Sequence, residues 1–515
     1  MTNSEETHTK KRTWLLPVIT LVILILLGVL LMNLFGGNDN ALKPQKKVIV
    51  NNDAPAIKSA KKISLADFGA KPDDGKDDTE AIEKAIKEAT TEAIELEIPA
   101  GTYETSRTIE VSDIKGLHIK GNGAVIRPKN PMTNPPEFYA FRLNGMADDL
   151  IEMEIEGITI DGSRNPQDLY FKMKDEKDFY KTPMTKGFAV TNTKQLTVHD
   201  VKFEHMYGGY TVFAQEYRNV DIHDVTLEDV GGDDITDSFG MAFYLSGHKD
   251  DAIVNIDNVV SNAKTSKRSK EYMGWIGVVF ENGTIQDADE DKWLKDQNTT
   301  FNITNSVFND YETTLHVEST YGNVYMNSDN VKTRAKNYFI AAGVNGELKE
   351  RSNNVTVDLL PYGRNGIVHG IYYTEGMDPK KYELNMYNST VNNLKIDGKR
   401  TPITAVYANN TTATFHNTTF SDASGLLVAN ATGTFIDSVI NLSDDANPDK
   451  LSDFSEDGQK MNLGKSVVNK DGKTSTAKTG DVPQKVFATG KAVPKRDNPL
   501  APADLGREAQ PIKGE

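Results

Sequence analysis

The chain has 515 residues, of which 38% are apolar, so it is long enough for one large domain or two or three ordinary ones. A formal net charge of −16 disfavours nucleic acid as a partner, because phosphate binding depends on a basic surface. The absence of cysteine excludes disulfides, thiolate metal sites, a cysteine nucleophile and a lipid-modified N-terminal cysteine. A neutral or weakly charged partner fits this composition better, and an extracellular protein without disulfides points weakly to a bacterial envelope.

An uncharged, apolar segment lies near the start of the chain. Residues 14–35 (WLLPVITLVILILLGVLLMNLF) carry no charged side chain, and at about 1.5 Å per residue such a helix crosses a hydrocarbon layer of roughly 30 Å. The segment is longer than the apolar region of a cleaved signal peptide, so we expect an uncleaved transmembrane helix. Basic residues flank it at 10–12 and at 43, 46 and 47, and the closer cluster favours a cytoplasmic N-terminus. The expected location is the cell membrane, single-pass, with the C-terminal domain extracellular.

Composition divides the chain further. After a cytoplasmic tail at 1–13 and the anchor at 14–35, residues 36–62 are rich in Asn, Asp, Lys and Pro, which is typical of a flexible linker. Residues 63–442 carry regular apolar patterns and form the predicted domain. Beyond them the patterns weaken, so we expect an irregular or disordered tail at 443–515.

One helix is expected at the start of the domain, within DDTEAIEKAIKEATTEA. Its apolar side chains recur at the spacing of one helical face, at Ile82, Ala85, Ile86 and Ala89. Asp77 and Glu80 have the spacing of a capping box. Strand-like segments rich in β-branched residues follow to the end of the domain.

These strand segments repeat. The phrases VHDVKF, IHDVTL, IDNVVS, ITNSVF, MNSDNV, VDLLPY, MYNSTV, FHNTTF and FIDSVI fit one template, starting at Val198, Ile222, Ile256, Ile303, Met326, Val357, Met386, Phe415 and Phe435. Several steps are about 20 to 30 residues, a period that is typical of a β-solenoid. Asn305, Asn388 and Asn417 suit its turns, because asparagine tolerates a left-handed backbone and can stack on its copy in the next coil. A β-sandwich would lack a shared template and a propeller would need repeats nearer 40 residues, so both alternatives fit less well.

The start of the domain also resembles a known family. The resemblance is carried by ISLADFGAKPDDGKDDTEAIEKAI, then IPAGTYETSRTI, then IKGLHIKGNGAVI. These segments resemble the N-terminal element of the pectate-lyase-like superfamily, which includes family-28 polygalacturonases, phage tailspikes and mannuronan epimerases. The resemblance implies an all-β fold, a single-stranded right-handed parallel β-helix with an N-terminal capping helix, that handles carbohydrate polymers.

The catalytic phrases of this superfamily match only in part. Gly232, Asp233 and Asp234 resemble the second family-28 phrase, Gly247 with His248 partly resembles the third, and Arg334 with Lys336 faintly resembles the fourth. The first family-28 phrase is missing, as is the Asp-Pro-His-Glu phrase of the epimerases. Neither activity follows from the resemblance.

A second strand recurs ahead of most template phrases: TVFAQ, AFYLS, GVVFE, TLHVE, IYYTE and AVYAN. If alternate side chains point inward, two columns face solvent. One column is Phe213, Tyr244, Val279, His316, Tyr373 and Tyr407; the other is Gln215, Ser246, Glu281, Glu318, Glu375 and Asn409. An aromatic row beside an acidic row suits a sugar chain, so Tyr244, Tyr373, Glu375 and Tyr407 are predicted to bind substrate.

Glu281, Glu318 and His316 are the predicted catalytic residues of these columns. In adjacent coils the two glutamate backbones would lie about 4.8 Å apart, and carboxylates at roughly 5 to 5.5 Å serve as acid and nucleophile in retaining glycosidases. His316 could instead move protons, as a lyase needs. The alternative is that outward strand residues of an acidic protein are often Glu by chance.

Asp233 and Asp234 complete the candidate set. With Asp237 they lie in the loop GGDDITDS, which fits a hydrolase acid cluster, a Ca²⁺ site or a solvated turn. No other metal or cofactor is expected. His199, His205 and His369 are interpreted as structural or surface residues.

Two functions remain open. One is a hydrolase or lyase that cleaves an envelope or extracellular polysaccharide. The other is a noncatalytic glycan-binding or scaffold protein of the cell surface. The substrate polymer, metal dependence and oligomeric state do not follow from the residues.

Overall fold

The computed structural model describes residues 60–129, 138–146, 150–164, 185–207, 209–231, 240–246, 251–263, 274–281, 297–320, 322–344, 346–361, 370–375, 382–401, 403–408, 411–428, 431–447, 452–453, 461–464, 466–470, 473–476 and 488–489. The predicted transmembrane helix at 14–35 lies outside these residues. Within them, no helix is both long and apolar enough to cross a membrane.

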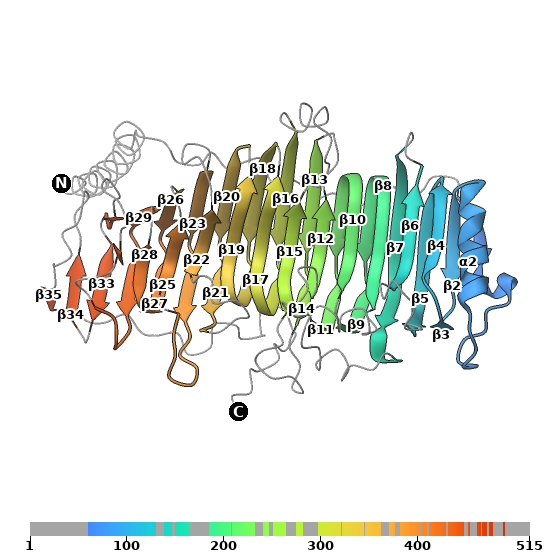
Figure 1. Cartoon of the computed structure of the whole chain (residues 1–515), viewed down its shortest axis with the longest axis horizontal. Helices are drawn as coiled ribbons and strands as arrows, with labels where there is room; N and C mark the ends of the chain where they lie inside the picture. The colour runs from blue at the N-terminus through green and yellow to red at the C-terminus, as the bar shows by residue number, and fades with distance from the viewer. Residues whose placement is uncertain are drawn as a thin grey trace, which may run out of the picture. The chain divides into compact units, whose positions relative to one another are not determined.

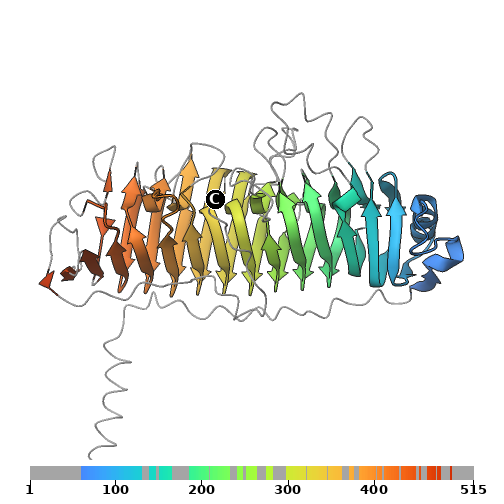
Figure 2. The ribbon, with the colours of Figure 1, turned by 90° about the horizontal axis from the view of Figure 1, so that it is seen from below.

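Parallel strands stacked coil upon coil make up the domain, so the predicted parallel β-helix is confirmed (Figures 1 and 2). Each complete coil contributes to three sheets, here called the first, second and third walls in chain order. Long strands such as β10 (Tyr210–His223) bend between walls: its first half pairs with β12 and its second half with β13.

The first wall consists of β1 (Lys61–Ser64), β2 (Ile94–Ile98), the first part of β5 (Leu117–Pro128) and of β7 (Ile151–Asp161), the second part of β8 (Lys186–His199) and of β10, then β13 (Ala252–Asp257), β16 (Asn298–Thr304), β18 (Asn323–Asp329), β20 (Leu348–Asn353), β23 (Tyr382–Tyr387), β26 (Thr411–His416), β29 (Ala431–Ile436) and β32 (Met461–Asn462).

The second wall consists of β3 (Gly101–Thr105), the second part of β5 and of β7, β9 (Lys202–Tyr207), β11 (Thr226–Gly231), β14 (Val260–Asn262), the first part of β17 (Val307–Thr320) and of β19 (Lys332–Val344), then β21 (Thr356–Leu359), β24 (Thr390–Asn393), β27 (Thr419–Ala423), β30 (Val439–Leu442) and β33 (Val467–Lys470). After it, β34 (Lys473–Thr476) and β35 (Ala488–Thr489) pair antiparallel.

The third wall consists of β4 (Ile109–Ile114), β6 (Tyr139–Gly145), the first part of β8 and of β10, β12 (Met241–Ser246), β15 (Gly274–Glu281), the second part of β17 and of β19, then β22 (Gly370–Glu375), β25 (Ile403–Ala408), β28 (Gly425–Val428) and β31 (Ser452–Asp453). Short 3₁₀ helices are η1 (Leu65–Phe68), η2 (Glu88–Thr90) and η3 (Gly162–Arg164).

Helix α2 (Thr79–Lys87) lies at the N-terminal end of the stack, as predicted (Figure 1). Its side chains Ile82, Ala85 and Ile86 are fully buried and belong to the same apolar core as the strands, so the helix covers the open end of the first coil. The predicted capping box does not form. Asp78 is the N-cap, while Asp77 accepts a hydrogen bond of 3.0 Å from the backbone N–H of Thr79.

Inward side chains stack on their copies in neighbouring coils and form one apolar core. In β13, for example, Ala252, Val254 and Ile256 are buried. Near the C-terminal end, the rings of Phe415 and Phe435 stack with centroids 4.9 Å apart. Because parallel coils repeat at about 4.8 Å, ring stacking of this kind matches the strand spacing.

A left-handed residue recurs at the turn from the first wall to the second. These residues have φ between 48° and 55°: Asp200, Asp224, Asn258, Asn305, Asn330, Asn354, Asn388, Asn417 and Asp437. The predicted stacking is present, since the Asn330 amide donates to Oδ1 of Asn305 at 2.8 Å and the Asn417 amide donates to Oδ1 of Asn388 at 2.7 Å. Asparagine and aspartate accept this backbone with less strain than most residues.

The strand register corrects two positions of the predicted repeat template. Ile303 is the partner of Ser328, not of Met326, and Ser328 is the partner of Ser352. The copies predicted to begin at Met326 and Val357 therefore begin at Ser328 and Ser352. Matching apolar first residues caused the error, because serine occupies that inward position in both coils. The strands β31, β32 and β33 pair in parallel with the coil before them, so a further coil follows Leu442.

Candidate functional site

The two outward columns predicted on the third wall are present as strand partners. Phe213 lies opposite Tyr244, Tyr244 opposite Val279, and Val279 opposite His316. In the second column Ser246 lies opposite Glu281, and Glu281 opposite Glu318. The two predicted catalytic glutamates thus lie in adjacent parallel strands, at a backbone separation of about 4.8 Å.

One coil was missing from the predicted alignment. Strand β19 lies between β17 and β22, which places Ile340 between His316 and Tyr373. It also places Ala342 between Glu318 and Glu375. An apolar coil therefore separates Glu318 from the acidic and aromatic positions beyond it.

The inward residues agree with the predicted alternation. The described side chains are buried in the core at Val212, Ala214, Phe243, Leu245, Val278, Phe280, Leu315, Val317, Tyr372, Thr374 and Val406. Val279 departs from the pattern: it faces outward but is only 1% exposed, because it packs with Met241 and Ile276 in a small cluster on the outer side. The partly buried rings of Tyr210, Tyr244 and Trp275 cover this cluster.

Tyr244 and Glu281 are joined directly. The Tyr244 hydroxyl donates a hydrogen bond of 2.6 Å to Oε2 of Glu281. Burial raises the pKa of Tyr244, and the carboxylates of Glu281 and Glu318 raise it further. Tyr244 therefore stays protonated and acts as a hydrogen-bond donor to the acidic column.

His316 lies beside Glu318 on the same strand. Its Nε2 is 3.5 Å from Oε2 of Glu318, and the ring is 9% exposed. Burial lowers the pKa of His316 to about 4, so the imidazole is neutral near pH 7. Its Nδ1 has no hydrogen-bond partner among the residues that the structure describes. When Nε2–H faces the Glu318 carboxylate, the lone pair of the neutral ring lies on Nδ1, which is buried.

An aromatic surface adjoins the Tyr244–Glu281 pair in the preceding coils. The ring of Tyr210 lies 5.1 Å from that of Tyr244, and the ring of Phe213 lies 5.2 Å from it. All three side chains are partly exposed. They form a continuous platform next to the Tyr244–Glu281 hydrogen bond, and flat aromatic faces suit the C–H surfaces of sugar rings.

Basic groups that were not predicted lie beside or beneath the aromatic rings of the third wall. Lys186 Nζ lies 4.6 Å from the ring centroid of Tyr210 and 5.1 Å from that of Tyr139, and Arg142 lies over Tyr139 at 4.8 Å. Lys186 is almost fully buried. No repeated phrase contains Lys186 or Arg142, so only the fold places Lys186 against Tyr210 of the platform and Arg142 over Tyr139. Such cation–aromatic pairs fix the rings in place.

Several predicted residues lie partly or wholly outside the described part of the chain. Asp233, Asp234, Asp237, Gly247, His248, His369 and Asn409 do so entirely. Tyr373 and Tyr407 are backbone partners on β22 and β25, but their side chains, and that of Glu375, lie outside it. The predicted substrate contacts of these residues stay predictions.

Arg334 and Lys336, the faint family-28 match, lie where β19 turns from the second wall. Arg334 donates two hydrogen bonds to Asp310, at 2.8 and 2.9 Å, and Lys336 Nζ lies 3.5 Å from Oε1 of Glu312. Both basic side chains are buried. These ion pairs give them a structural role, since a buried charge needs a partner.

Two groups of described side chains have the donors for a metal ion: Asp161, Glu204 and His205; and Glu156, His199 and Asp200. In the first group Asp161 already accepts hydrogen bonds from His205 at 2.9 Å and from Arg127 at 3.0 Å. These bonds, with those from Ser163, hold the pKa of Asp161 well below its usual range although burial opposes them.

Comparison with known proteins supports the fold. Residues 62–135 match the family model described as rhamnogalacturonase A/epimerase, pectate lyase-like. This match confirms the resemblance seen in the N-terminal element. A sequence comparison with curated proteins gives no match.

Solved structures of similar fold include the Dettilon tailspike protein, at a TM-score of 0.51 and 13% identity, covering 81% of this chain and 76% of that one. Others are PfbA, a surface adhesin of Streptococcus pneumoniae (TM-score 0.49, 12% identity, 84% and 100% covered), and the family 28 exopolygalacturonase of Yersinia enterocolitica (0.46, 12%, 80% and 78%). At these identities the similarity shows the fold and no activity.

Proposed function

We propose that the protein acts on an envelope or extracellular polysaccharide along the outer face of its third wall, as a hydrolase or lyase. The observation that carries the proposal is the adjacency of Glu281 and Glu318 beside the aromatic platform of Tyr210, Phe213 and Tyr244. The pectate-lyase-like match over residues 62–135 is consistent with it.

The paired glutamates suit acid and nucleophile roles. Carboxylates held at roughly 5 to 5.5 Å can attack and protonate a glycosidic bond with retention of configuration. Tyr244 orients Glu281 through its hydrogen bond, and we assign proton transfer to Glu318 and the neutral His316. In a lyase, His316 would accept the proton from the sugar carbon that is bonded to the carboxylate.

We also propose that residues 14–35 anchor the protein in the cell membrane with the β-helix outside the cell. This placement is consistent with a polymeric extracellular substrate. It rests on the uncharged run alone.

Product release from candidate polysaccharides tests the catalytic role. We expect the wild type to generate new reducing ends or unsaturated sugars and Glu318→Gln to reduce the rate at least 100-fold, with Glu281→Gln behaving alike. Glu383→Gln is the matched control, because Glu383 faces solvent on the first wall. Equal rates in Glu318→Gln, Glu281→Gln and Glu383→Gln would contradict the assignment of Glu281 and Glu318 as catalytic residues.

A noncatalytic glycan-binding role is the second candidate. It is favoured by the incomplete catalytic phrases and by the apolar coil of Ile340 and Ala342, which interrupts the acidic column. It predicts saturable binding to a glycan array without new reducing ends or unsaturated sugars.

A further inference from the structure

Imidazoles and carboxylates gather on the outer face of the first wall, on a different sheet from the proposed polysaccharide site. His118 comes from β5, Glu154 and Glu156 from β7, and His199 from β8, which are consecutive strands of this wall. The register places His118 opposite Glu154, and Glu156 opposite His199. All four side chains are half-buried.

The four side chains bring their ligand atoms close together. His118 Nε2 lies 2.9 Å from Oε1 of Glu156, and His199 Nε2 lies 3.0 Å from Oε1 of Glu154. The crossed pairs are also near, at 3.8 Å from His118 Nε2 to Glu154 and 3.7 Å from His199 Nε2 to Glu156. Ligand atoms bound tetrahedrally at 2.0 to 2.2 Å are about 3.3 to 3.5 Å apart, and the four histidine–glutamate separations bracket this value. Glu156 and His199 also belong to a group, with Asp200, whose ligand atoms all lie within 4.8 Å of one another.

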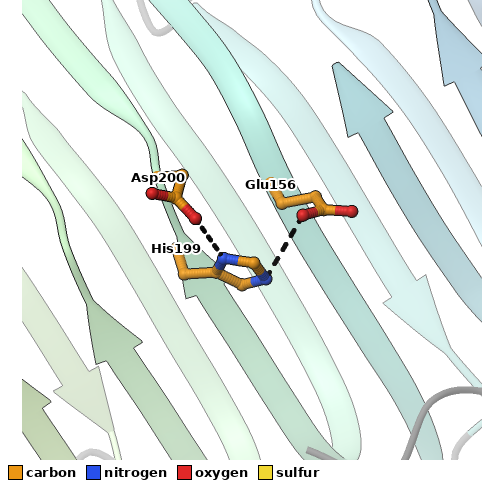
Figure 3. A group of neighbouring side chains, drawn as sticks. All are labelled: Glu156, His199 and Asp200. Atoms are coloured by element: carbon orange, nitrogen blue, oxygen red, sulfur yellow. Dashed lines mark hydrogen bonds and ion pairs between the residues drawn. The ribbon is translucent and has the colours of Figure 1, made fainter. Parts of the chain in front are cut away.

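His199 has the orientation of a metal ligand. Its Nδ1 lies 2.8 Å from Oδ2 of Asp200, while its Nε2 faces Glu156 (Figure 3). The same Nε2 lies 3.0 Å from Oε1 of Glu154. In protein metal sites a ligating histidine usually donates a hydrogen bond from one ring nitrogen to a carboxylate and binds the ion through the other. The ring of His223 stacks on that of His199 at 4.8 Å and 8°, and its Nδ1 lies 2.9 Å from Asp224, so His199 is held from a second side.

We propose that His118, Glu154, Glu156 and His199 bind one divalent late transition-metal ion, with Zn²⁺ as the representative, and that Asp200 is the positioning carboxylate. Imidazole nitrogen with carboxylate oxygen favours Zn²⁺, Co²⁺ or Ni²⁺ over Ca²⁺ and Mg²⁺. Lys120, whose Nζ lies 3.7 Å from Glu156, turns away when the ion binds.

Isothermal titration of the full-length chain with ZnCl₂ tests the proposal. We expect one saturable site per chain. His199→Gln and Glu156→Gln each weaken the affinity at least tenfold, and Asp200→Asn weakens it by about tenfold. The matched control is His416→Gln, because His416 also faces outward from the first wall, 3.6 Å from Asp437; it leaves the affinity unchanged.

Circular dichroism and melting of the metal-free variants establish that they fold. Cobalt(II) in place of zinc adds a spectroscopic readout, since coordinated imidazole produces visible absorption bands that His199→Gln reduces. The proposal is overturned by the absence of one-to-one binding, by equal losses in His199→Gln and His416→Gln, or by Ca²⁺ displacing Zn²⁺ at equal concentration.

Discussion

The hydroxyl of Tyr244 donates a hydrogen bond of 2.6 Å to Oε2 of Glu281, although the two residues are 37 positions apart in the chain. Parallel coiling makes them neighbours: Tyr244 lies opposite Val279, two residues before Glu281 on the adjacent strand. The bond ties the aromatic platform to the acidic column, and several properties of the protein depend on such contacts between coils.

Replacing Tyr244 by phenylalanine removes the donor and keeps the ring. We expect Tyr244→Phe to lower the free energy of unfolding by about 1 kcal/mol, because the Glu281 carboxylate loses a hydrogen bond. Glycan affinity should change little in this variant but fall several-fold in Tyr244→Ala, which also removes the stacking face. Urea unfolding and equilibrium binding measure the two effects; the same affinity in Tyr244→Ala as in the wild type would exclude stacking on this ring.

His316 should make the protein less stable in mild acid. Because burial lowers its pKa from 6.5 to about 4, the unfolded chain takes up a proton first as the pH falls. The stabilising contribution is complete above about pH 6.5 and is lost as the pH falls through 4, with a total of roughly 3 kcal/mol. His316→Gln should flatten this part of the profile in urea unfolding. If the free energy of unfolding changed with pH in the same way in the wild type and in His316→Gln, His316 would not be a buried, neutral imidazole.

Glu350 should have the opposite effect. This glutamate is fully buried in the core, where it accepts hydrogen bonds from Ser352 and, at 2.6 Å, from Tyr372. Burial raises its pKa from 4.5 to about 7, so the folded state holds its proton longer than the unfolded chain. The associated stability is complete below about pH 4.5 and is lost as the pH rises through 7, by roughly 3 kcal/mol in all.

The variant Glu350→Gln stays uncharged and should lose this dependence. Unfolding free energies at about pH 5 and pH 8 measure it, with Glu383→Gln on the exposed face as control. His316→Gln removes the contribution of His316 and keeps Glu350. Equal stability of His316→Gln at about pH 5 and pH 8 would contradict the buried carboxyl of Glu350.

Asn305 should stabilise the folded protein through its left-handed backbone conformation as well as through the hydrogen bonds of its side chain. It has φ of 50°, donates to Asp257 at 2.8 Å and accepts from Asn330 at 2.8 Å. Asn305→Ala combines left-handed strain with two lost hydrogen bonds and should cost about 2 kcal/mol. Asn305→Gly removes only the hydrogen bonds and should cost about half as much. Equal melting temperatures for the two variants would argue against backbone strain at this turn.

Much of the fold could be predicted because each coil repeats the same local chemistry. Inward apolar residues and left-handed asparagines recur in order, so the adjacency of Glu281 and Glu318 followed from aligning strands 37 residues apart. The strand of Ile340 and Ala342 was left out of the aligned columns because its outward positions are apolar and resemble no neighbour. The phrase MNSDNV, with its left-handed Asn330, had already marked the coil to which this strand belongs.

The histidine cluster could not be predicted as one site. His199 and His223 occupy the same place in the phrases VHDVKF and IHDVTL, which signals a column, but His118 and Glu154 lie in earlier coils outside the template. Lys186 reaches Tyr210 of the aromatic platform in the same way, through coil stacking. Contacts between side chains of non-repeating coils can be predicted only when the register of the strands is known.

The affinity of the protein for its best-binding polysaccharide tests most directly whether the third wall is the carbohydrate site. We predict that the double variant Phe213→Ala/Tyr244→Ala binds at least tenfold more weakly than the wild type, since each ring contributes about 1 kcal/mol. Tyr387→Ala, which truncates a partly exposed aromatic residue of the first wall, should bind like the wild type. Equal affinities for the double variant and the wild type would contradict the account.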